Sequence, residues 1–241
     1  MTLYLDPDLA IIDPHLHLWD IPAIAGSLQE PQTFLVRDAA DLIAASGHNI
    51  THTVYVEAYA MHRGTGLAEL RSLGETEFAN GMAAMAASGL YGPCRIADRI
   101  VGHVDLCLGD NVKRVLDQHC ARAGERFCGV RMNTSFSAAG LFGAAAEPLA
   151  EFRLSDPNFI TGARVLAQQG LSIDVWCLHP QLPQVLQLAQ QVPYLAIILN
   201  HVGTPDVRGV FAERQDEAMA EWRRHMLALS HAPNVMVKLS G

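Results

Sequence analysis

Short apolar runs alternate with amphipathic stretches along nearly the whole chain. Runs rich in aliphatic and β-branched residues predict seven strands, at residues 11–20, 51–57, 100–106, 127–133, 171–177, 195–199 and 234–241. Helical spacing of apolar positions predicts helices between them, at residues 38–46, 75–88, 111–123, 159–169, 182–191 and 211–230. Gly47, Gly89 and Gly170 follow three of these helices, and Asp156-Pro157 precedes one, as is typical of helix boundaries.

The alternation predicts parallel strands joined by helical crossovers, for which an open doubly wound sheet and a barrel are the two candidates. A glycine-rich phosphate loop does not follow the first predicted strand, which disfavours a nucleotide-binding open sheet. Polar residues follow many different strands, as they do around a barrel mouth. We therefore predict an α/β fold of the (β/α)8 TIM-barrel type, with about seven strands present.

We expect residues 1–241 to form a single barrel domain that is incomplete at its C-terminus, because the pattern contains no eighth strand. Residues 58–99 are expected to be an inserted loop and helix region over the barrel mouth. Irregular loops are expected at residues 21–33 and 138–156, where prolines and glycines are frequent. A seven-stranded barrel would also leave two open strand edges.

Composition narrows the class of protein. The net charge is −8 with no basic cluster, so nucleic acid and anionic membranes are poor partners. The sequence shows neither a secretory signal pattern nor an apolar run long enough to cross a bilayer. Five cysteines without a CxxC spacing favour free thiols and a cytoplasmic location.

The His-x-His pair at the end of the first strand is the first candidate for chemistry. Side chains alternate faces along a strand, so His15 and His17 point the same way and can share a divalent cation or polarise one substrate group. Other polar residues close later strands and would face the same rim of a barrel. They are Glu57, Asp105, Arg131, Asn133, His179, His201, Lys238 and Ser240. His103 lies in mid-strand and is expected to be a core histidine, whereas His48, His52, His62, His119, His225 and His231 are expected to have surface or packing roles.

These segments resemble the amidohydrolase superfamily, and within it the "amidohydrolase 2" group of TIM-barrel hydrolases, which includes sugar-lactone and pyrone-dicarboxylate lactonases. The resemblance covers the chain from about Ile11 onward. The matching segments are IDPHLHLW at 12–19, VYVEA at 54–58, GVR at 129–131, LHPQLP at 178–183, LNHVGTP at 199–205 and VKLSG at 237–241.

The resemblance implies roles for individual residues. His15, His17 and His179 would bind a divalent metal ion such as zinc or manganese, and His201 would orient or polarise the substrate. Arg131 would bind a substrate carboxylate, and Glu57 a sugar hydroxyl or the metal. The family's general base is an aspartate that ends strand eight, and this sequence has no such residue. Some similar lactonases work without metal, so both modes stay open.

Three functional hypotheses follow. The first is a hydrolase that uses activated water on a lactone or carboxylic ester of a small acidic or sugar-derived molecule. The second is a zinc-dependent, non-oxidative decarboxylase with a similar set of histidines. The third is an inactive fragment, or a module that another polypeptide completes. The expected partner is a small-molecule substrate, and homo-oligomers are compatible with the sequence.

Overall fold

A computed structural model describes residues 6–22, 32–140, 144–146, 148–208 and 211–240. The chain forms two compact units. The first contains residues 1–103 and 117–128, and the second contains residues 104–116 and 129–241. Each unit is built on parallel strands.

The sheet of the first unit contains three parallel strands, β1 (Ile11–Leu16), β4 (Ile50–Val56) and β5 (Arg95–His103), in that order. Two further short strands, β2 (Trp19–Ile21) and β3 (Gln32–Phe34), form an antiparallel pair. The sequence pattern did not predict this pair, because three-residue strands are too short to show an alternation. Most of the loop expected between them lies outside the described residues.

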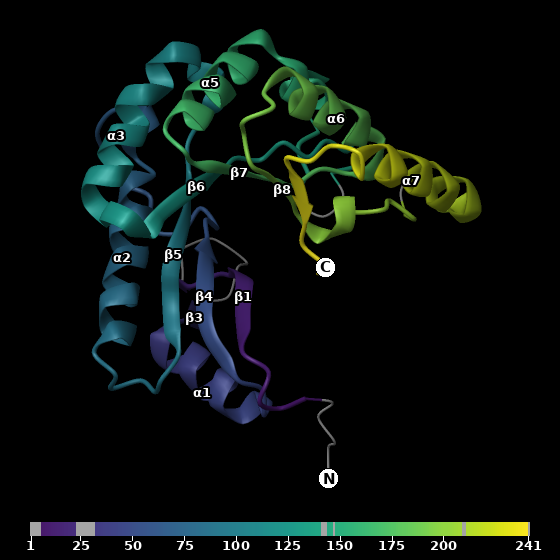
Figure 1. Ribbon diagram of the computed structural model, residues 1–241. Coiled ribbons are helices and arrows are strands. Elements are labelled where there is room, and N and C mark those ends of the chain that lie inside the picture. The colour runs from purple at the N-terminus through teal and green to yellow at the C-terminus, as the bar shows by residue number, and fades with distance from the viewer. Residues whose placement is uncertain (1–5, 23–31, 141–143, 147, 209–210, 241) are drawn as a thin grey trace. The chain divides into compact units, whose positions relative to one another are not determined.

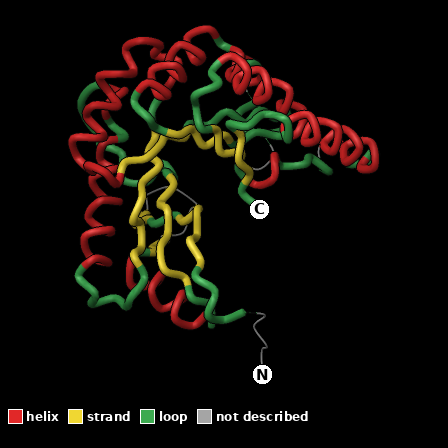
Figure 2. The backbone as a smooth tube through the Cα atoms, viewed as in Figure 1, coloured by secondary structure: helices red, strands yellow, loops and turns green. Residues whose placement is uncertain are grey.

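Helices α1 (Val36–Ser46) and α2 (Leu73–Ala87) belong to the first unit, with the short 3₁₀ turns η1 (Ala68–Leu70) and η3 (Gly124–Arg126). Gly47 ends α1 in the left-handed conformation, as predicted. Helix α2 runs alongside β5 in both Figure 1 and Figure 2, and three alanines at helical spacing, Ala79, Ala83 and Ala86, are buried. The helix lies so close that a Cβ at Gly102 would come within 3.0 Å of the Thr76 hydroxyl of α2.

The sheet of the second unit contains four parallel strands, β6 (Phe127–Arg131), β7 (Ser172–Val175), β8 (Ile197–Leu199) and β9 (Val235–Val237). The first two residues of β6 belong to the first unit, and the strand enters the second unit at Gly129. Its helices are α4 (Pro148–Glu151), α5 (Pro157–Gln168), α6 (Leu182–Gln191) and α7 (Gln215–Leu229). Figure 1 shows α5, α6 and α7 on one side of β7 and β8. The 3₁₀ turns of this unit are η2 (Leu106–Asn111), η5 (Arg153–Ser155), η6 (His179–Gln181) and η7 (His201–Gly203), and α3 (Val112–Ala123) has residues in both units.

In each unit, every strand of the parallel sheet pairs with the next such strand along the chain, without the reversal that marks a doubly wound sheet. This confirms the predicted α/β fold of the TIM-barrel type, with seven parallel strands among the described residues. The five cysteines are thiols, as expected. In the described part of the chain, none of the helices combines the length and the apolar character that a bilayer crossing needs.

Candidate functional site

The His-x-His pair forms a compact imidazole pair at the end of β1. Nε2 of His15 lies 3.1 Å from Nε2 of His17, with the two rings nearly perpendicular, so both side chains point the same way as the strand alternation predicted. Nδ1 of His17 lies 2.7 Å from the carbonyl oxygen of Val56, the last residue of β4. Because a carbonyl only accepts, His17 donates from Nδ1, and Nε2 of the neutral ring carries the lone pair.

This pair fits two positions of a metal site. Two nitrogens bound to one tetrahedral zinc at about 2.0–2.1 Å lie roughly 3.3 Å apart, close to the separation of these two Nε2 atoms. The bond from His17 to the backbone is the usual outer-shell contact that fixes the tautomer of a ligating histidine.

Glu57 and His103 occupy the ends of the neighbouring strands. The buried Glu57 follows β4, and its N–H donates to the Val101 carbonyl of β5 at 2.8 Å. An oxygen of its carboxylate, Oε2, lies 4.0 Å from Nδ1 of His103. His103 is the last residue of β5 rather than a mid-strand residue, because the strand ends there, three residues before the predicted end at Leu106. The sequence pattern therefore missed its place at the strand end.

Two further side chains join this group from the segment after β4. The Tyr59 ring centroid lies 4.8 Å from that of His103 and 5.3 Å from that of His62. Tyr59 has a φ of 56°, a conformation that non-glycine residues rarely adopt. His62 lies in no recognised motif, and the one available signal was its position in the segment that follows a predicted strand.

His179 lies in the second unit, directly after β7, and is fully buried. Its Nδ1 accepts the N–H of Asp206 at 3.0 Å, so the neutral ring carries its hydrogen on Nε2, for which no acceptor is present among the described residues. Burial lowers the pKa of His179, which favours this neutral form. As placed, His179 accepts a hydrogen bond at Nδ1 and carries an N–H at Nε2. To ligate a metal through Nε2 it would have to give up its bond to Asp206.

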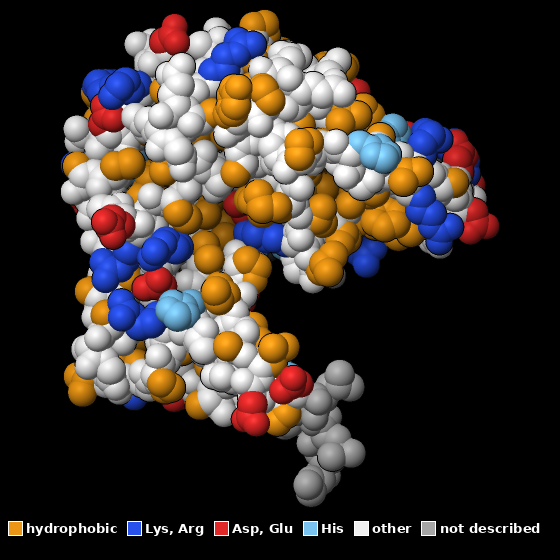
Figure 3. Space-filling view, in the orientation of Figure 1, with side chains coloured by type: hydrophobic (Ala, Val, Ile, Leu, Met, Phe, Trp, Pro, Cys, Tyr) orange, Lys and Arg blue, Asp and Glu red, His pale blue; other side chains and the backbone are white. Residues whose placement is uncertain are grey.

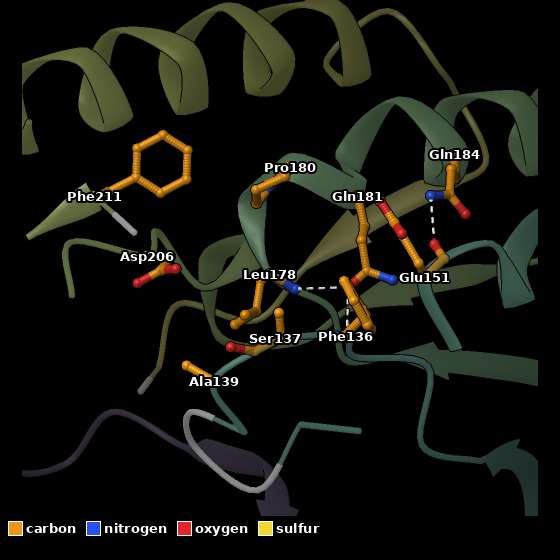
Figure 4. A pocket seen from close by; sticks show the side chains of 11 residues that line it. Phe136, Ser137, Ala139, Glu151, Leu178, Pro180, Gln181, Gln184, Asp206 and Phe211 are labelled. Atoms are coloured by element: carbon orange, nitrogen blue, oxygen red, sulfur yellow. Dashed lines mark hydrogen bonds between the residues drawn. The ribbon is translucent and has the colours of Figure 1, made fainter. Parts of the chain in front are cut away.

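A cavity of about 180 Å³ lies beside this histidine. Figure 4 shows Phe211, Leu178 and Phe136 around it, with Asp206 and Ser137 as polar neighbours. Gln181 fixes the backbone on one side of this cavity. Its Oε1 accepts the N–H of Phe136 at 2.8 Å, and its Nε2 donates to the Thr134 carbonyl at 2.8 Å.

A buried polar network occupies the strand ends of the second unit. Asp174 of β7 accepts hydrogen bonds from Lys238, which follows β9, and from Asn200, which follows β8. Arg131, at the end of β6, donates from Nη1 to Oδ1 of Asn200 at 3.5 Å. A carboxylate at this end of β7 was not predicted, because Asp174 lies inside an apolar run.

His201 follows β8 in a tight turn. His201, Val202 and Thr204 have φ values of 51°, 49° and 33°, so three non-glycine residues hold the left-handed conformation. Nδ1 of His201 lies 3.0 Å from Oγ of Ser240. Burial, and after it the nearby cations Arg131 and Lys238, lower the pKa of His201.

The predicted site residues thus fall into two sets. His15, His17 and Glu57 are neighbours in the first unit, and Arg131 and His201 share the strand ends of the second unit with His179. Across the described ranges, no three His, Cys, Asp or Glu side chains are grouped as a metal site requires.

Comparisons with known proteins show the family of the chain. A family model described as amidohydrolase (Amidohydro_2) matches residues 12–241. The chain belongs to this amidohydrolase family. An uncharacterized protein of Sinorhizobium fredii is 30% identical over 248 residues, which cover 97% of this chain and 73% of that protein.

Two solved structures show the same fold. An amidohydrolase of Burkholderia multivorans with bound zinc has a TM-score of 0.66 at 24% identity, covering 95% of this chain and 69% of that one. A probable 2-pyrone-4,6-dicarboxylic acid hydrolase of Acinetobacter baumannii, with citric acid bound, has a TM-score of 0.54 at 13% identity, covering 95% and 83%. The chain is therefore an amidohydrolase-type hydrolase on a TIM-barrel fold.

A shorter match is to an enzyme whose name states its substrate. An L-fucono-1,5-lactonase of Burkholderia multivorans is 31% identical over 88 residues, which cover 36% of this chain and 29% of that enzyme.

Proposed function

We propose that this amidohydrolase hydrolyses a lactone or another carboxylic ester of a small acidic or sugar-derived molecule by attack of water. The observation that carries the proposal is the His15–His17 pair, fixed by the Val56 carbonyl beside Glu57 at the ends of parallel strands. Relatives whose names refer to a fuconolactone and to a pyrone dicarboxylate support this substrate class. A cytoplasmic location is part of the proposal and is supported by the five thiols.

The residues of the first unit suit the attack on a carbonyl. His15 and His17 present imidazole nitrogens that polarise the carbonyl oxygen, directly or through a shared zinc or manganese ion, which would act as a Lewis acid when bound. Glu57 is a buried acceptor for a substrate hydroxyl. For the second unit, Arg131 as a carboxylate partner, His201 as a substrate-orienting group and His179 as a ligand or donor remain part of the same proposal.

The test is hydrolysis of a panel of sugar lactones and pyrone lactones, followed by acid release with a pH indicator. We expect turnover of at least one lactone, and a loss of about 10²-fold or more in kcat/KM for His15→Ala and His17→Ala. His48→Ala, at an exposed position, is the control and should keep full activity. Release of carbon dioxide instead of a hydroxy acid would replace the lactonase with the decarboxylase.

Elemental mass spectrometry of the same dialysed samples decides the role of the metal. About one zinc or manganese per chain, lost in His15→Ala and His17→Ala but kept in His48→Ala, supports the metal-assisted form. Full lactonase activity in chelator-treated, metal-free protein supports direct polarisation by the imidazoles.

A further inference from the structure

The cavity beside His179 has the size and the walls of a small-ligand site. The described residues that line it all belong to the second unit. Its volume of about 180 Å³ is enough for one small organic molecule, since an apolar cavity of about 150 Å³ accepts benzene. An aromatic and aliphatic surface faces this space, formed by Phe136, Leu178, Pro180 and Phe211.

The amide side chains of the wall are already bonded to the backbone. Gln181 accepts the N–H of Phe136 and donates to the Thr134 carbonyl, both at 2.8 Å. Nε2 of Gln184 donates to the Glu151 carbonyl at 2.8 Å. These amides brace the wall, so the ionic groups of the lining decide which ligand fits.

Asp206 is the buried ionic group of the lining. The residue is 4% exposed, and its Oδ1 accepts the N–H of Arg208 at 2.9 Å. Among the described residues, no hydrogen bond or ion pair engages its other oxygen, Oδ2. Because a buried carboxylate is stabilised by a partner of opposite charge, this oxygen is suited to a cation that enters the cavity.

The second charged side chain of the lining is also an acid. Figure 4 shows Glu151 on the opposite side of the cavity from Asp206, and the described lining contains no lysine, arginine or histidine. Arg214, whose guanidinium carbon lies 5.4 Å from the Phe211 ring centroid, pairs with Glu217 at 3.1 Å. The charges of the lining therefore attract a cation and repel an anion.

An aromatic ring and the buried carboxylate are fixed through the same residue. The N–H of Phe211 donates to the Arg208 carbonyl at 3.0 Å, and the N–H of Arg208 holds Asp206. On its other side, the Phe211 ring centroid lies 4.9 Å from that of His179. An ammonium group at Asp206 would gain a further attraction from the electron-rich face of a nearby ring.

We propose that this cavity binds a small primary amine with an apolar body. The ammonium group donates to the Asp206 carboxylate, and the body packs against Phe136, Leu178, Pro180 and Phe211. The inference goes beyond the proposed lactone hydrolysis, because the carboxylates of this cavity would repel an acidic substrate.

A titration of the full chain, followed by ¹⁵N–¹H NMR at pH 7, tests the preference for charge. Benzylamine, benzyl alcohol and benzoate share one ring and a similar size but are cationic, neutral and anionic. We expect benzylamine to bind about tenfold more tightly than benzyl alcohol, because a charge-assisted hydrogen bond replaces a neutral one, and benzoate not to bind. Shifts of the Phe136 and Phe211 backbone N–H signals would place the probe in this cavity.

Two substitutions separate charge from shape. Asp206→Asn keeps an oxygen for the Arg208 N–H but removes the charge, so the affinity for benzylamine should fall about tenfold and that for benzyl alcohol should not change. Phe211→Ala removes part of the wall and should weaken both ligands by a similar factor. Glu213→Gln is the matched control for the loss of one negative charge, because Glu213 is exposed and is not among the lining residues.

The absence of benzylamine binding, or equal affinities for benzylamine and benzyl alcohol, overturns the proposal. A benzylamine affinity that Asp206→Asn leaves unchanged, or that Glu213→Gln lowers as much, also overturns it. If Asp206→Asn weakens benzyl alcohol as well, the substitution has altered the cavity, and the ratio of the two affinities in the unmodified protein decides. Because these measurements record binding alone, their result is independent of whether a lactone is hydrolysed.

Discussion

His119 shows how much one buried side chain contributes to pH-dependent stability. It stacks on Phe127 with ring centroids 5.0 Å apart and lies between α2 and β5, close to Gly102. Protonation would place a charge at a buried site where the ring nitrogens contact two hydroxyl groups, those of Thr76 and Ser72, so its pKa falls from 6.5 to about 3. The folded state therefore requires the neutral ring.

We predict that the protein loses stability as the pH falls below about 6.5. In that range the unfolded chain binds a proton at His119 and the folded chain does not, so the free energy of unfolding decreases by up to about 1.4 kcal/mol per pH unit until the folded pKa is reached. Urea unfolding at pH 7 and pH 5 should differ by about 2 kcal/mol from this residue alone. The difference should shrink in His119→Gln and persist in His48→Gln. An equal difference in both variants would contradict this account.

At the scale of elements, the stability of helix α5 depends on the residues that cap its N-terminus. The Asp156 carboxylate accepts the N–H of Asn158 at 2.7 Å and that of Phe159 at 3.2 Å, and Pro157 occupies the first turn, where a missing N–H costs nothing. The helix then packs on η2 so closely that a Cβ at Gly162 would come within 2.3 Å of the Leu106 carbonyl oxygen. A less stable first turn of α5 should therefore loosen the packing of this helix on η2 in the second unit.

Asp156→Ala should lower the free energy of unfolding by about 1 kcal/mol, because two helix N–H groups lose their acceptor. Asp156→Asn keeps a side-chain oxygen and should cost much less. Denaturant unfolding of the three proteins provides the comparison. If Asp156→Ala has the same free energy of unfolding as the unmodified protein, water replaces the carboxylate as the acceptor at no cost.

This helix also shows what the sequence could predict. Asp156-Pro157 and Gly170 marked its ends correctly, because capping is local chemistry that a few residues encode. The start of β5 at Arg95 was missed, since its first residues alternate with charges and Ala97 has a φ of 54°. The hydrogen bond between His62 and Glu75 was missed for a different reason: thirteen residues separate them, and only tertiary packing of α2 on β5 brings them together.

On the scale of the whole molecule, two of the described parallel strands are paired on one side only. Among the described strands, β1 pairs only with β4, and β9 pairs only with β8. Figure 3 shows hydrophobic side chains gathered in the region of β9 and α7. Met236 and Leu239 are 49% and 89% exposed there. Unpaired backbone groups next to apolar side chains are the usual template for pairing with another chain.

We therefore predict that this chain self-associates through the β9 edge as its concentration rises. A lysine at this edge introduces a charge that an apolar contact cannot bury cheaply, so the double variant Met236→Lys and Leu239→Lys should sediment as a smaller species than the unmodified protein. Leu90→Lys is the matched control, since Leu90 is 83% exposed but follows α2, away from any strand edge. Sedimentation velocity over a concentration series measures the difference. If the control variant reduces association as much as the edge variant does, general surface charge is the cause and β9 is not the interface.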